Sequence, residues 1–279
     1  MVKKITFFFV SLLVFLPSCR DDGEEAFLGG QTRSAVADST VDLYDPVMAE
    51  VNALYTPEEW YSYIFKTSSL TGEQKALVLE YLGHLTDNKY DKWYAPLLRL
   101  LRFNKIERIY VSSKAPVSAG YDPSTNVIIF KSISAMSESA VTEELLHAGQ
   151  NRVYPDGISQ YGFKGLPNIE FEVRFFRDLI AYIEDRPITP TTGSDNFNEY
   201  YFWIEDICKE NPLESTFPSV DRVLEIKIDG QGYYDMVQAF RTYLPAYAGL
   251  IDYGLKPLYI GFIYNSISHL PSTAEYEVI

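Results

Sequence analysis

The sequence predicts an α+β fold that is mainly α and contains one small β-sheet. Apolar residues recur at helical spacing along most of the chain, whereas two short runs, 106–112 and 126–131, are rich in β-branched residues. The stretch 42–279 is long enough for one sizeable hydrophobic core and shows no internal repeat. We therefore expect a single globular domain over 42–279, preceded by a leader and a linker.

Four helices are predicted ahead of the sheet. Thr56 followed by Pro57 is typical of a helix N-terminus, because proline is favoured at the first helical position. Thr71 precedes a second run that has a broad apolar face. The expected helices cover residues 46–54, 57–66, 71–86 and 94–103.

The two predicted strands are separated by a turn at 122–126, and further helices follow them. The turn contains Asp, Pro, Ser and Asn, which favour a tight reversal of the chain. We predict a helical turn with a short strand over 220–230. The other expected helices cover residues 137–150, 167–180, 198–208, 232–244 and 257–268.

The N-terminus has the features of a secreted lipoprotein. Lys3 and Lys4 precede an apolar run, 5–16, which is too short for a stable membrane span. The sequence Leu-Pro-Ser-Cys that ends at Cys19 then resembles a bacterial lipobox, whose cysteine is acylated, with palmitate among the usual chains. The resemblance implies a signal peptide over 1–18 and a membrane anchor at Cys19.

The residues after the anchor predict a tether and a location. The stretch 29–40 is small and polar, as in a linker, and 21–25 is acidic, so we expect residues 19–41 to form a lipidated tether. Acidic residues soon after the acylated cysteine resemble the surface-export signal of Bacteroidetes lipoproteins. This resemblance implies an outer-membrane lipoprotein that faces the cell exterior. The alternative is a solvated tether in the periplasm.

Composition excludes some partners. The formal net charge of −14 repels phosphate groups, so we expect no nucleic-acid binding. Cys208 is the only cysteine besides Cys19, so no intrachain disulfide is expected. We expect Cys208 to be a small buried residue.

The stretch 137–150 contains the candidate chemistry. Glu143 and His147 are four residues apart, so on a helix they share one face at about 6 Å and can reach one metal ion. Carboxylate and imidazole are both zinc ligands, at about 2.0–2.2 Å. Because an O,N,O ligand set is harder than N,N,O, it also suits other divalent ions.

The same residues resemble a known motif. Glu144 and His147 stand as the second and fifth residues of HExxH, with Glu143 replacing the first histidine. The pattern is similar to the gluzincin-type zincin metallopeptidases in degenerate form. The resemblance implies a zincin-like fold with a sheet before the motif helix, a bound zinc, Glu144 as general base, and a peptide or protein substrate. It also implies a third ligand, a glutamate, on a later helix.

Two glutamates are candidates for that third ligand. Glu172 lies on the apolar stripe of the predicted helix 167–180, where a bare charge would need a partner. Glu170, the alternative, faces the side of Arg174 and Arg177. Periodicity therefore favours Glu172. In the loop between the two helices, Tyr154 or Tyr161 would stabilise an oxyanion, and the sequence does not choose between them.

Competing hypotheses come from other functional classes. Because Glu143 replaces a histidine ligand, the chain is alternatively a non-catalytic surface binding or scaffold lipoprotein that holds no metal. The high aromatic content also suggests a glycan-binding partner of an outer-membrane uptake system. The metal content of the purified protein distinguishes the metallopeptidase-like hypothesis from the metal-free scaffold hypothesis.

Overall fold

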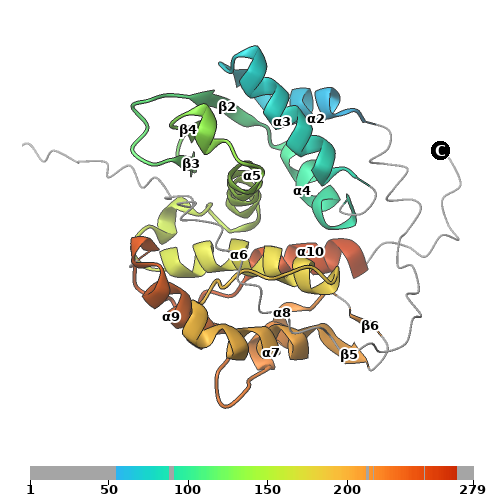
Figure 1. The fold of residues 1–279 in the computed structure, drawn as a ribbon, viewed down its shortest axis with the longest axis vertical. Coiled ribbons are helices and arrows are strands. Elements are labelled where there is room, and N and C mark those ends of the chain that lie inside the picture. The colour runs from blue at the N-terminus through green and yellow to red at the C-terminus, as the bar shows by residue number, and fades with distance from the viewer. Residues whose placement is uncertain (1–54, 88–90, 212–213, 216, 248, 269–279) are drawn as a thin grey trace, which may run out of the picture.

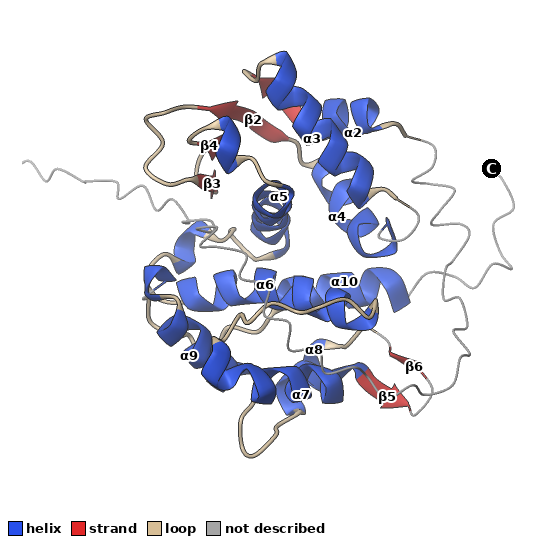
Figure 2. Cartoon of the chain, viewed as in Figure 1, coloured by secondary structure: helices blue, strands red, loops and turns tan. Residues whose placement is uncertain are grey.

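The computed structural model describes residues 55–87, 91–211, 214–215, 217–247 and 249–268. It is mainly helical with one small four-stranded sheet ahead of the motif helices, which confirms the α+β, mainly α prediction (Figures 1 and 2). The signal peptide, Cys19, the linker, the predicted helix 46–54 and His269 lie outside the described residues. None of the described helices is long and apolar enough to cross a membrane.

The first helices begin at the caps that the sequence predicts. Thr56 accepts a hydrogen bond from the backbone N–H of Glu59, and the Glu59 carboxylate accepts one from Thr56 N–H, a capping box at the start of α2. Thr71 and Gln74 form the same arrangement at the start of α3. The bounds are α2 Pro57–Ile64, α3 Gly72–Leu85 and α4 Asp91–Phe103.

The sheet has the order β1-β2-β4-β3, with β1, β2 and β4 parallel and β3 antiparallel to β4. Helix α2 ends at Ile64, so the expectation that the helix beginning at Pro57 continues to about residue 66 is wrong. The chain leaves the helix after Ile64, because the buried Phe65 pairs with Ile106 as the first residue of an edge strand. The bounds are β1 Phe65–Ser68, β2 Ile106–Val111, β3 Ala119–Asp122 and β4 Val127–Phe130.

The second half of the described chain is helical apart from a two-stranded ribbon. Its helices are α5 Glu138–Val153, α6 Leu166–Ile183, α7 Phe197–Cys208, α8 Val220–Glu225, α9 Tyr233–Tyr243 and α10 Leu258–Ser268, and its strands are β5 Lys209–Asn211 and β6 Glu214–Ser215. Cys208 is buried, as expected. Aromatic side chains fill the space between α6, α7 and α9, including Phe171, Phe175 and Trp203.

Helix α5 lies at the centre of the molecule. It packs against α3, α4 and β3 on one side and against α6 and α10 on the other (Figure 1). Every residue from Ala140 to Gln150 is buried, so the helix has no solvated face over that stretch. The polar residues of the motif are therefore inside the protein, where each needs a partner.

Candidate metal centre

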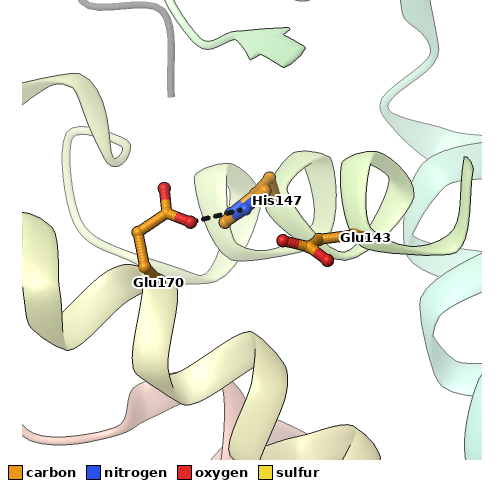
Figure 3. Close-up of side chains that lie close together, drawn as sticks. All are labelled: Glu143, His147 and Glu170. Carbon is orange, nitrogen blue, oxygen red and sulfur yellow. Dashed lines mark ion pairs between the residues drawn. The ribbon is translucent and has the colours of Figure 1, made fainter. Parts of the chain in front are cut away.

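Three side chains from two helices converge in the interior. Glu143 and His147 lie one turn apart on α5, and Glu170 reaches them from α6 (Figure 3). One ligand atom from each lies within 4.8 Å of the other two. Glu143 and His147 are 0% exposed and Glu170 is 1% exposed. This is a buried Glu-His-Glu group whose donor atoms can hold a metal ion.

The spacing inside the group suits an ion. His147 Nε2 and Glu170 Oε2 are 3.5 Å apart, which is long for a hydrogen bond. Two ligands at about 2.0–2.2 Å from a tetrahedral zinc stand about 3.4 Å from each other. His147 Nε2 and both Glu170 oxygens are buried and make no hydrogen bond within the described chain. These atoms could therefore hold a cation.

The orientation of His147 is set by Gln150, one turn further along α5. Gln150 Nε2 donates to the Ile169 carbonyl at 3.0 Å and to Glu172 Oε2 at 2.7 Å, and the carbonyl can only accept. Gln150 Oε1 therefore faces His147 Nδ1, at 2.9 Å, as an acceptor. His147 Nδ1 carries a proton, and in the neutral ring Nε2 keeps a lone pair directed at Glu170.

Glu172, the residue that periodicity favours as third ligand, lies outside the converging group. Its carboxylate accepts from Gln150 Nε2 and Tyr154 Oη, both at 2.7 Å, and from the backbone N–H of Tyr259 at 2.8 Å and of Ile260 at 3.1 Å. A carboxylate has about four lone-pair positions, and four donors occupy them. The structure thus brings the alternative, Glu170, to Glu143 and His147, and ties Glu172 to α10.

Two guanidinium groups contact Glu143. Arg177 Nη1 lies 3.3 Å from Glu143 Oε2, and Arg174 Nη2 lies 3.5 Å from Glu143 Oε1. Both arginines are on α6, the helix that carries Glu170. Helical periodicity predicts that Arg174 and Arg177 lie on the same side of the helix as Glu170. In the structure their guanidinium groups contact Glu143 and offset its negative charge. The positive charge near Glu143 weakens the attraction of a cation to this ligand.

Proton affinity in the group follows from burial and charge. Burial lowers the pKa of His147, but the carboxylates of Glu170, Glu144 and Glu143 outweigh it and raise the pKa to about 9. Burial raises the pKa of Glu170, and His147 opposes that rise. A metal-free centre at neutral pH therefore holds a protonated imidazole beside the carboxylate. A cation has to displace that proton.

Glu144, the expected general base, is 0% exposed and lies near His147 without belonging to the converging group. Two surface hollows, one between α4 and α10 and the other beside the α4–β2 turn, are lined by other residues. Glu144 is therefore closed off from solvent in this structure.

The remaining sequence candidates lie elsewhere. Tyr154 donates to Glu172, and Tyr161 packs edge-on against Tyr154 with ring centroids 5.6 Å apart. His84 Nδ1 pairs with Glu138 Oε1 at 3.2 Å on the surface. The motif does not predict a role for Gln150, although its position three residues after His147, on the same helical face, is a usable signal.

Comparison with known proteins adds no relative. No family model, no curated protein and no solved structure matches this chain. Functional inference therefore depends on the site itself.

Proposed function

We propose that this chain is a metallopeptidase-like protein that binds one divalent cation through Glu143, His147 and Glu170. Zn²⁺ is the expected ion. The observation that supports this proposal most is the arrangement around His147, whose Nε2 faces Glu170 and whose other nitrogen is held by Gln150. Histidine ligands in metal sites have such a partner on the second nitrogen. For one set of ligands, affinity rises from Mn²⁺ toward Zn²⁺, which favours zinc over manganese.

The catalytic part of the proposal concerns Glu144. A bound zinc would polarise a peptide carbonyl and lower the pKa of a water molecule. Glu144 would accept the proton from that water, as the general base of the gluzincin-type motif. Because Glu144 is fully buried, a peptide substrate requires an opened form of the protein.

Zinc binding is tested by dialysing the purified chain against Zn²⁺ and measuring bound metal per chain. We expect one zinc in the wild type and a loss of it in Glu170→Ala. Glu138→Gln is the matched control, because Glu138 also lies on α5 but is half-exposed and pairs with His84. Metal that remains in Glu170→Ala at the wild-type level would show that the ion binds elsewhere.

A second candidate function is a metal-free binding or scaffold protein. The contacts of Arg174 and Arg177 with Glu143 favour it, because they neutralise one ligand without any ion. A protonated His147 beside Glu170 completes an ion-paired cluster. A wild-type chain that binds no zinc, manganese or cobalt would support this function.

We further propose that the protein is anchored to the outer membrane through Cys19 and faces the cell exterior. The lipobox-like sequence and the acidic stretch 21–25 support this location. Cys19→Ala should leave the membrane fraction, and protease treatment of intact cells should remove the wild type. Protection until lysis would instead place the protein in the periplasm.

A further inference from the structure

We propose that Gln150 and Glu172 are positioning residues of the metal centre, which act through His147 and couple it to the start of α10. The inference rests on the proposed metal binding at Glu143, His147 and Glu170. It gives Glu172 a different role from that of a ligand. The carboxylate holds Gln150, and Gln150 fixes which nitrogen of His147 is free for the ion.

The direction of each hydrogen bond is determined by the chemistry of its partners. The Ile169 carbonyl has no proton to give, so the atom of the Gln150 amide that faces it must be Nε2, and the same nitrogen donates to Glu172. A flipped amide would place its oxygen against the Ile169 carbonyl oxygen, which can only accept. Gln150 therefore has one orientation, and its oxygen accepts the Nδ1 proton of His147.

Glu172 is fixed as firmly as Gln150. It is 0% exposed, and its donors come from three separate parts of the chain: α5, the loop after α5, and the first turn of α10. The backbone N–H groups of Tyr259 and Ile260 lie at a helix N-terminus, where a carboxylate is favoured. Asparagine or glutamine at this position would offer only one acceptor oxygen to four donors.

The chain of contacts runs from α10 to the centre through four groups: the Tyr259 and Ile260 N–H groups, the Glu172 carboxylate, the Gln150 amide and the His147 ring. An ion on His147 Nε2 polarises the ring and strengthens the Nδ1–H bond to Gln150. Metal binding should therefore be detectable at the first amides of α10, although α10 supplies no ligand of the converging group.

The test compares Gln150→Met with Tyr154→Phe in the full-length chain, using Zn²⁺ as the probe. Gln150→Met keeps the length of the side chain but removes the acceptor for His147 Nδ1–H. We expect it to weaken Zn²⁺ binding by about 10- to 100-fold, the usual effect of losing such a partner. Tyr154→Phe removes another donor to Glu172 and leaves Gln150 in place, so its affinity should stay within about threefold of wild type.

A spectroscopic signature separates positioning from a general loss of structure. In the metal-free wild type, NMR should show a slowly exchanging His147 Nδ1–H with contacts to the Gln150 side chain. This signal should persist in Tyr154→Phe and disappear in Gln150→Met. On addition of Zn²⁺ to the wild type, the Tyr259 and Ile260 amide signals should shift.

The outcomes distinguish the two proposals. A wild type that binds no Zn²⁺ overturns the metal centre, and the Nδ1–H signal still tests the hydrogen-bond chain. A wild type that binds Zn²⁺ while Gln150→Met binds as tightly as Tyr154→Phe overturns the positioning role alone. A metal-free wild type without the Nδ1–H signal overturns that role whatever the metal affinity.

Discussion

Glu170 and Glu172 stand two residues apart on α6, are equally buried, and have opposite surroundings. Four donors from α5, the loop after it and α10 reach Glu172. Within the described chain no hydrogen bond reaches Glu170, and His147 Nε2 stands 3.5 Å away. A buried carboxylate needs donors or a cation. The comparison therefore separates Glu172, whose lone pairs are used by donors within the protein, from Glu170, whose oxygens could serve the proposed metal centre.

Asp178, two turns further along the same helix, repeats the pattern of Glu172. Its oxygens accept from the N–H and hydroxyl of Thr189, from Thr191 Oγ1 and from Tyr200 Oη. This saturated carboxylate joins the loop after α6 and helix α7 to α6. Glu172 and Asp178 are thus fully hydrogen-bonded carboxylates on α6, and Glu170 on the same helix differs from both.

The largest expected effect is the loss of stability in Glu172→Leu. Tyr154 can still donate to the Lys256 carbonyl, but three N–H donors would remain in the interior without an acceptor, at about 1–3 kcal/mol each, so we expect a loss of about 4 kcal/mol or more. Glu170→Leu removes only the partner of protonated His147, and because the imidazole can release that proton and become neutral, its cost should be smaller, about 2 kcal/mol. Urea denaturation of the metal-free variants measures both. Equal losses would remove the distinction between the two residues.

Asp178→Leu should cost about 3 kcal/mol, because the Thr189 N–H and three hydroxyls lose their acceptor and only partly pair with one another. Zn²⁺ affinity should not change, since Asp178 lies outside the contacts that lead to His147. Urea denaturation and zinc titration check the two parts. A changed affinity would mean that saturated carboxylates in general, not only Glu172, influence the centre.

The protonation of His147 predicts how the stability of the metal-free protein depends on pH. Its pKa of about 9 lies above the ordinary value of 6.5. A raised pKa stabilises the fold fully below pH 6.5, and that stability is lost as pH rises through 9. We expect a decrease of up to about 3 kcal/mol between pH 6.5 and 9.5. In His147→Gln the decrease should be absent, and a wild-type slope in that variant would assign the titration to another group.

The sequence predicts much of this arrangement, and the part that it misses is non-local. Helical spacing suffices to place Glu143 and His147 on one face, and the helix caps locate α2 and α3. Periodicity indicates that Glu172 is buried but not what surrounds it, because two of its donors come from the distant residues Tyr259 and Ile260. Strands β1 and β3 are missed for the same reason, since short strands depend on pairing partners.

A zinc titration of the melting temperature tests the central claim most directly. Zn²⁺ at a hundredfold excess over its Kd should stabilise the wild type by about 2.7 kcal/mol. His147→Ala and Glu170→Ala should lose this gain, and Glu144→Gln should keep it. An unchanged melting temperature in well-folded wild-type protein, with manganese and cobalt as well as zinc, would contradict the metal centre and leave the ion-paired scaffold in its place.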